Sequence, residues 1–211
     1  MATISHKNLT GLQLHENKGV ASATNGQVAT ADGAGSTVWK KLDSSNLSGT
    51  GNPFGAQLLH VREEQVSGVY SGTGFAATNN VCVLNTVKTN EISSATLSSN
   101  TVSLPAGTYF AWGTTNVFHG LGPNQAGSSR VHLQNTTAGT QLVIGTNAYT
   151  QNGAAQALYP THFLQLRGRF TLASTSNIQM QVYVLNGASA MHPFSGVGNE
   201  VYSELQIWKV A

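Results

Sequence analysis

Apolar and polar residues alternate with a period of two along most of the chain from residue 56 onward. Within residues 162–172, every second side chain from Leu164 to Leu172 is apolar or glycine, and those between are polar. The same alternation returns at 131–133 and 178–184. Successive side chains of a β-strand point to opposite faces of the sheet, so this pattern predicts half-buried strands. No segment shows a helical period, which predicts an all-β fold.

Further strands are expected at 58–65, 81–89, 108–117 and 141–145, separated by turns rich in Gly, Asn and Ser. About eight strands with this spacing favour an antiparallel two-sheet jelly-roll sandwich.

The last strand is predicted to place Val201, Leu205 and Ile207 on the core face. Large apolar residues also stand opposite the core positions of several strands. Scattered exposed apolar residues are ordinary, but their clustering in a nearly uncharged protein favours a subunit interface. The interface residues predicted on this basis are Phe163, Tyr183, Leu185, Tyr202 and Trp208.

The segment before the β domain is polar and interrupted by glycine. Its Asn-Gly and Asp-Gly pairs favour tight turns, so residues 20–24 and 27–31 are expected to form a hairpin that leans on a partner chain. We therefore divide the chain into an extended N-terminal arm (1–43), a Ser/Gly-rich linker (44–56) and a jelly-roll domain (57–211).

Composition excludes several classes of function. Charged residues make up 9% of the chain, against about 25% in ordinary domains. A net charge of +2 with no Lys/Arg cluster argues against nucleic acid as a partner. No stretch is apolar enough to span a membrane, and no secretion signal is visible. The single cysteine, Cys82, permits no intrachain disulfide, which suits synthesis in a reducing cytoplasm, and it is expected to be a small buried apolar residue.

Catalytic patterns are weak, and we expect no enzymatic activity and no cofactor. No Asp follows Asp43, so an Asp-supported catalytic triad cannot form within the β domain. Glu63 and Glu64 are neighbours in a predicted strand and should point to opposite faces, whereas a glycosidase needs two facing carboxylates. Glu200 and Glu204 are expected to share a face as solvated charges.

Seven histidines raise the possibility of a metal site. None are spaced as His-x-His or His-x-x-x-His. His6 and His15, with Glu16, could meet on a threefold axis if each chain supplied one ligand. Isolated histidines are more often exposed or hydrogen-bonded, so no metal is predicted.

The β domain resembles the trimeric jelly rolls of the C1q and tumour necrosis factor type found on phage fibres and decoration proteins. The matching segments are LPAGTYFAW at 104–112, RVHLQN at 130–135, LRGRFTL at 166–172 and ELQIW at 204–208. This resemblance implies a homotrimer in which the final strand closes the inner sheet at the trimer axis.

The N-terminal segment is similar to that of virion proteins of tailed bacteriophages, through LTGLQLHENKG at 9–19 and ADGAGSTVW at 31–39. The similarity implies an arm that binds the phage major capsid protein. The residues assigned to this contact are His6, Leu9, Leu12, Leu14, His15, Lys18 and Trp39.

Two functions follow from these resemblances. In the first, the chain is a homotrimeric capsid decoration (cement) protein or short head fibre, made in the host cytoplasm and placed on the capsid exterior. In the second, it is the receptor-binding tip of a tail fibre, with a host surface glycan as partner. The lack of a long shaft in the sequence favours decoration. Aromatic loop residues that could bind a glycan are Trp39, Tyr149, Tyr159 and Phe194.

Overall fold

The computed structural model describes residues 27–31, 37–41, 57–72, 75–153, 155–186, 188–189 and 198–210. The chain divides into two units, Met1–Gly55 and Ala56–Ala211, and each is described by itself. Among the described residues, no helix is long and apolar enough to cross a membrane.

The first unit contains one described hairpin. Strand β1 (Gln27–Ala31) pairs antiparallel with β2 (Thr37–Lys41), so that Ala31 lies opposite Thr37. The strand at 27–31 was predicted, and its partner among the described residues is 37–41. The connection between these two strands contains the Asp-Gly pair. Residues 20–24 and most of the predicted arm and linker lie outside the described residues.

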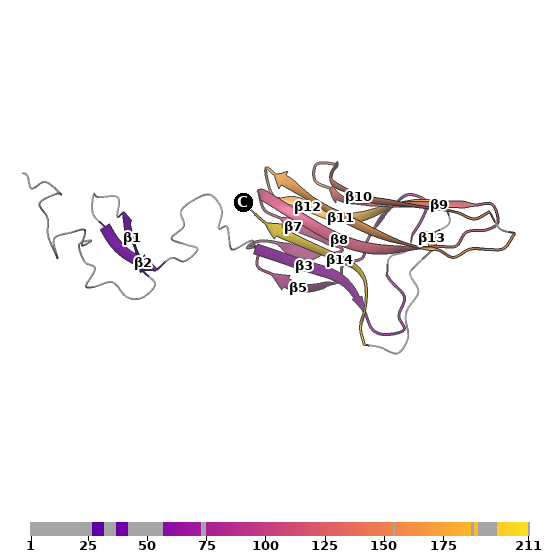
Figure 1. The fold of residues 1–211 in the computed structure, drawn as a ribbon, viewed down its shortest axis with the longest axis horizontal. Helices are drawn as coiled ribbons and strands as arrows, with labels where there is room; N and C mark the ends of the chain where they lie inside the picture. Colours follow the sequence, from indigo (N-terminus) through magenta and orange to yellow (C-terminus); the bar gives the residue numbers. More distant parts are fainter. Residues whose placement is uncertain are drawn as a thin grey trace, which may run out of the picture. The chain divides into compact units, whose positions relative to one another are not determined.

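The second unit is an antiparallel two-sheet jelly-roll sandwich, which confirms the predicted fold class (Figure 1). One sheet, called the β8 sheet, has the order β11-β8-β14-β3-β5, with β13 paired to β8. The other, called the β9 sheet, has the order β10-β9-β12-β7-β6, with β4 paired to β12. The strands of the β8 sheet are β3 (Gln57–Gln65), β5 (Thr86–Asn90), β8 (Gly107–His119), β11 (Thr161–Leu172), β13 (Ala188–Ser189) and β14 (Glu200–Lys209). Those of the β9 sheet are β4 (Asn79–Val81), β6 (Thr96–Ser98), β7 (Thr101–Leu104), β9 (Ala126–Asn135), β10 (Thr140–Gln151) and β12 (Ser176–Leu185).

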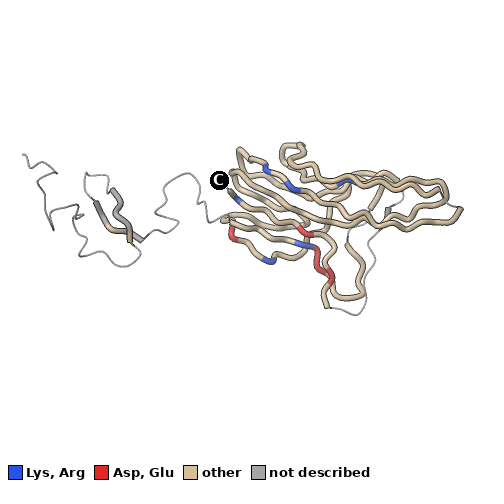
Figure 2. Tube along the Cα trace, viewed as in Figure 1, with Lys and Arg blue, Asp and Glu red and all other residues tan. Residues whose placement is uncertain are grey.

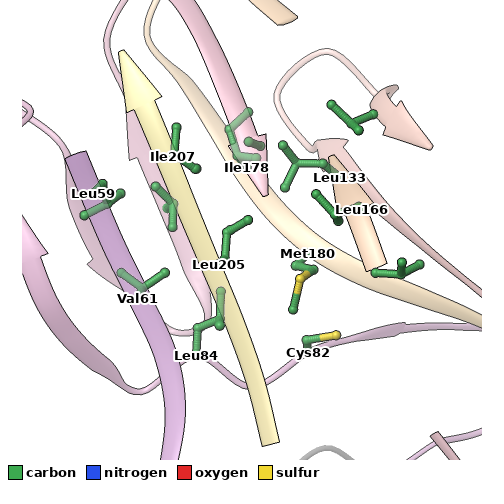
Figure 3. Packing of buried hydrophobic residues seen from close by; sticks show 14 of the residues in the cluster. Leu59, Val61, Cys82, Leu84, Leu133, Leu166, Ile178, Met180, Leu205 and Ile207 are labelled. Atoms are coloured by element: carbon green, nitrogen blue, oxygen red, sulfur yellow. The ribbon is translucent and has the colours of Figure 1, made fainter. Parts of the chain in front are cut away.

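The core lies between the two sheets and is formed by the apolar positions of the predicted alternation. Leu166 of β11 and Leu205 of β14 enter it from the β8 sheet, while Leu133 of β9 and Met180 of β12 enter it from the β9 sheet (Figure 3). All four are essentially inaccessible to solvent. Burying a side chain of this size contributes about 1.5–3 kcal/mol, so the facing layers supply the main stabilisation of the sandwich.

The predicted strand at 81–89 is in fact two short strands that belong to different sheets. β4 ends at Val81 and β5 begins at Thr86. Between them, Cys82 and Leu84 are buried, and the Cys82 backbone N–H donates to the Met180 carbonyl oxygen (2.9 Å). Burial raises the pKa of the Cys82 thiol to about 12, in keeping with the predicted role as a small buried apolar residue.

A β-bulge in β14 reverses part of the predicted alternation. The register against β3 shifts between Val201 and Ser203, and both Tyr202 and Ser203 are buried. Val201 is 42% exposed instead of lying in the core. An extra residue in one strand changes the face on which its neighbours fall, which explains why strict alternation misplaced Val201 and Tyr202.

The two sheets meet at the edge where β10 lies against β11. The Gln165 backbone N–H donates to Thr146 Oγ1 (2.9 Å), beside a register shift in β10 between Ile144 and Asn147. Gly145 sits at this crossing, where a Cβ atom would lie 2.4 Å from the Gln165 carbonyl oxygen. The close approach of the two strands therefore requires glycine.

We expect Gly145→Ala to destabilise the protein by about 3 kcal/mol or more, because the added methyl meets backbone as well as packed side chains. Chemical denaturation at equilibrium measures this change. Gly153→Ala is the matched control, since a Cβ there meets nothing within 4 Å, and it should change the free energy of unfolding by less than about 0.5 kcal/mol. Equal stability of the two variants would contradict the close approach of β10 and β11 at Gly145.

Candidate functional site

The outer face of the β8 sheet carries a group of aromatic side chains. In β8, Tyr109 and Ala111 point into the core, so Phe110 and Trp112 point outward. Phe110 is 39% exposed, and its ring lies 6.0 Å from that of Trp208 on the neighbouring strand β14. Phe163 of β11 is 58% exposed and lies opposite Asn116. We call these four outward residues together with Phe118 the aromatic face: Phe110, Trp112, Phe118, Phe163 and Trp208.

Polar residues surround the aromatic face. Trp112 lies between Arg167 on β11 and Gln206 on β14. At the end of β8, the Phe118 ring stacks on Tyr159 at a centroid distance of 5.9 Å. A half-buried aromatic centre with a polar rim is the usual composition of a protein–protein interface.

The predicted interface residues do not lie on one surface. Phe163 and Trp208 belong to the aromatic face, whereas Tyr183 and Leu185 lie on β12 in the other sheet and are exposed there. Tyr202 is in the core, where its hydroxyl donates to the Val69 carbonyl oxygen (2.7 Å), so its assignment to an interface is wrong. The bulge in β14 explains the error.

Phe110, Trp112 and Phe118 were not among the predicted interface residues. Alternation along β8 could have found them, because each follows a buried position by one residue. Of the predicted capsid-binding residues, Trp39 lies in β2 and is half-buried. The remaining six, His6, Leu9, Leu12, Leu14, His15 and Lys18, lie outside the described residues.

The acidic residues described in the β domain all lie in or beside β3, β5 and β14 (Figure 2). Glu63 is fully buried and accepts hydrogen bonds from Ser71 Oγ (2.9 and 3.0 Å) and the Gly72 backbone N–H (2.5 Å). Glu63 thus ties the segment after β3 to the strand.

Glu64 has a different environment from Glu63, on the outer side of the strand. Asn199 Nδ2 donates to Glu64 (2.8 Å), and Arg62 forms an ion pair with it (3.0 Å). These two partners, with a smaller contribution from Lys88, lower the pKa of Glu64 to about 2. Glu63 and Glu64 therefore differ in burial as expected for opposite faces, and each carboxylate is occupied by structural partners.

The two carboxylates of β14, Glu200 and Glu204, are separated by the bulge, so the prediction that they share a face is wrong. Glu200 accepts a hydrogen bond from the hydroxyl of the buried Tyr202 and from the Gly68 backbone N–H (2.9 Å). Glu204 pairs with His60 Nε2 (2.5 Å) on the outer side of the sheet. Burial, followed by the contact with Glu200, raises the pKa of Tyr202.

Two buried histidines pack together at the end of the sandwich where β8 stops. The rings of His119 and His162 lie 4.3 Å apart. His162 is hydrogen-bonded through both ring nitrogens, to Ser129 Oγ and Thr150 Oγ1 (2.8 Å each). Burial lowers the pKa of both histidines, and for His162 the neighbouring His119 lowers it further.

Among the described residues, no group of three or more His, Cys, Asp and Glu side chains could hold a metal ion. His6, His15 and Glu16, the ligands considered for a threefold site, lie outside these residues.

Comparison with known proteins identifies no family. No protein-family model matches the chain, and no curated protein matches it. Solved structures that are similar include three of murine APRIL, a protein of the tumour necrosis factor family, at pH 5.0, 8.5 and 8.0. They are 11%, 12% and 12% identical to this chain, with TM-scores of 0.42, 0.42 and 0.43, and each match covers 74% of this chain and 100% of APRIL. A similarity of this size is limited to the arrangement of strands.

The buried histidine pair predicts that the protein loses stability in mild acid. Their folded-state pKa values lie below the unfolded value of about 6.5, so the unfolded chain binds more protons as the pH falls below that value. Each histidine then lowers the free energy of unfolding by up to about 1.4 kcal/mol per pH unit. Urea denaturation at a series of pH values from about 7.5 to about 5, which bracket the unfolded-state pKa of histidine, measures the slope.

The double substitution His119→Gln with His162→Gln should flatten this pH dependence, whatever its effect on stability at pH 7. The remaining histidines, including His60 and His132, are present in both proteins. An unchanged slope would show that the buried pair is not responsible.

Proposed function

We propose that this chain is a non-enzymatic structural protein of a tailed-bacteriophage virion, a homotrimer that decorates the capsid exterior. In this proposal, the aromatic face of the β8 sheet forms the subunit interface, and the N-terminal arm binds the major capsid protein. The aromatic face is the observation that carries the proposal, because a surface that exposes aromatic rings such as Phe110 and Phe163 is best covered by protein.

The composition of the aromatic face supports self-association over binding of a charged ligand. Phe163 is more than half exposed, yet it lies on the same sheet face as Trp112 and Trp208. Aromatic residues and arginine are enriched at the centres of interfaces, and Arg167 and Arg169 flank this centre on β11. A heterologous contact of this kind closes into a ring when the rotation between subunits fits.

The assignment to a virion is supported by the similarity of the N-terminal segment to phage virion proteins. A decoration protein binds the assembled shell and not its free subunits, so it stabilises the shell by mass action. Three arms on one trimer would also raise the strength of attachment through multivalency.

A receptor-binding tip is the second candidate, and exposed tyrosines favour it. Tyr159 is 63% exposed and stacks on Phe118, and Tyr149 is 65% exposed. An exposed aromatic ring in an uncharged surface could stack on the apolar side of a sugar. Loss of host adsorption in virions that lack the protein, with unchanged capsid stability, would favour this alternative.

Phe163→Arg should dissociate the trimer, because the interface would bury an arginine without a partner, at a cost of several kcal/mol. Leu185→Arg is the matched control, since Leu185 is 49% exposed on the other sheet and was also a predicted interface residue. Light scattering on the domain Ala56–Ala211 gives the mass of each variant. Micromolar concentration is roughly the range in which weak specific complexes form. A monomeric mass for the wild-type domain at this concentration would contradict the trimer proposal.

Removal of residues 1–50 should abolish attachment to capsids while leaving the trimer intact. Electron microscopy of virions assembled with the full-length or truncated protein shows its position and occupancy, and heating the virions measures genome release. We expect release at lower temperature without the arm. Full occupancy by the truncated protein would show that the arm is not the anchor.

A further inference from the structure

The β8 sheet carries unpaired cations at one edge and an unpaired carboxylate at the other. Strand β11 forms one edge, and Arg167 and Arg169 are exposed on it. Neither arginine forms an ion pair with a described residue. At the opposite edge, Glu91 directly follows β5 and is also exposed. The two edges of this sheet therefore offer charges of opposite sign.

Glu91 differs from the other carboxylates on this side of the sheet. Glu64 forms ion pairs with two cations, and Glu204 pairs with His60. Glu91 forms no ion pair with a described residue, and its Oε2 accepts a hydrogen bond from the Leu58 backbone N–H (2.9 Å). The carboxylate of Glu91 is thus held in place, but its charge is not balanced by a described residue.

Arg169 and Glu91 lie at the same level along the strands. Arg169 lies opposite Phe110 on β8. Phe110 lies opposite Trp208, which in turn lies opposite Leu58 on β3. The Glu91 backbone N–H donates to the Leu58 carbonyl oxygen (2.8 Å), so Glu91 ends the same row. A cation and a carboxylate therefore stand at the two ends of a row that contains two rings of the aromatic face.

These two charges are too far apart to pair within one chain. The row crosses from β11 to β5 through three intervening strands, and neighbouring strands are about 4.8 Å apart, which separates Arg169 from Glu91 by about 19 Å. An ion pair needs N and O atoms within about 4 Å of each other. Salt at physiological concentration screens exposed charges beyond about 8 Å. Each of the two charges is consequently open to a partner from another molecule.

Closed rotational symmetry makes the next copy of the chain a fitting partner. A rotation that closes a ring includes no translation along its axis, whereas a rotation with translation gives an open filament. Two residues on neighbouring subunits can then meet only if they lie at the same height along the axis. With the axis along the strands, Arg169 and Glu91 meet this condition.

We propose that Arg169 of one subunit forms an ion pair with Glu91 of the next subunit around the trimer. This inference rests on the proposed homotrimer and names the two edges that meet in it, the β11 edge of one copy and the β5 edge of the next. Arg167 lies two residues from Arg169 on the same face of β11 and would add positive charge at this contact. The pair would repeat at every contact of the ring.

The chemistry of the two groups suits this contact. A carboxylate has about four acceptor positions, so the hydrogen bond from Leu58 leaves room for a guanidinium. The planar guanidinium can donate two parallel N–H groups to it. Covering of Phe110 and Trp208 by the neighbouring subunit would exclude water nearby, and the attraction between charges grows as water is removed.

Sedimentation equilibrium of the full-length protein tests the pair through the dissociation constant of the trimer. We expect Arg169→Glu and Glu91→Arg each to weaken the trimer on the order of tenfold or more, because like charges would meet at every contact. The double variant exchanges the signs and restores the pair, so it should recover most of the wild-type affinity. Higher salt should weaken the wild-type trimer more than the trimer of Arg169→Gln.

Two further variants separate the charge from other effects. Gln141→Glu lowers the net charge as much as Arg169→Gln does, but Gln141 is exposed on β10 in the other sheet. We expect Gln141→Glu to leave the dissociation constant unchanged and Arg169→Gln to raise it. Glu91→Gln removes the charge while keeping an oxygen that can accept from the Leu58 N–H, so it should weaken the trimer without disturbing this corner of the fold.

The ion pair and the proposed function fail through different outcomes. A monomeric wild-type protein would remove the trimer, and the pair with it. A trimer that Phe163→Arg dissociates, but that both charge reversals leave unchanged, would overturn the ion pair and leave the aromatic interface in place. A double variant that is as weak as the single variants would overturn the pair in the same way.

Discussion

The apolar layer between the two sheets is the constraint on which the rest of the structure depends. A shift of one residue in any central strand would move its apolar side chains from this layer into water, so the register of each strand is fixed by what it buries. Met180 and Leu166 show this from opposite sheets: both flank Gly113, and a Cβ atom at Gly113 would lie 3.0 Å from Met180 Sδ. Tight packing of this kind leaves the inner faces no freedom to carry a function.

The outer faces are consequently where the two sheets differ. The β8 sheet presents aromatic rings beside charged side chains such as Arg167 and Arg169, whereas Arg130 is the one Asp, Glu, Lys or Arg in the strands of the β9 sheet. A weakly charged surface depends little on ionic strength, so contacts made by the outer face of the β9 sheet would rest on burial and local hydrogen bonds. Of the two faces, the aromatic face is the one proposed to contact another copy of the chain.

Most of the fold could be predicted from the sequence because burial on one face leaves a period of two, as in β11 and β12. The prediction was wrong where an extra residue changes that period. The bulge in β14 moved Val201 outward and Tyr202 inward, and no local sequence signal marks it. Periodicity also does not show which strands belong to the same sheet. Phe163 and Tyr183 were therefore assigned to one surface although they lie on different sheets. The same alternation could have predicted that Phe110 and Trp112 point outward.

The behaviour of ionisable groups inside the domain depends on the hydrogen-bond partners that surround them. Glu63 is enclosed by hydroxyl and backbone donors, and the His119–His162 pair is buried among hydroxyl groups. Hydrogen bonds to a carboxylate stabilise its charged form, whereas burial of an imidazole favours its neutral form. The satisfied carboxylate can therefore fasten a loop, while the buried histidines are expected to make the end of the sandwich sensitive to acid.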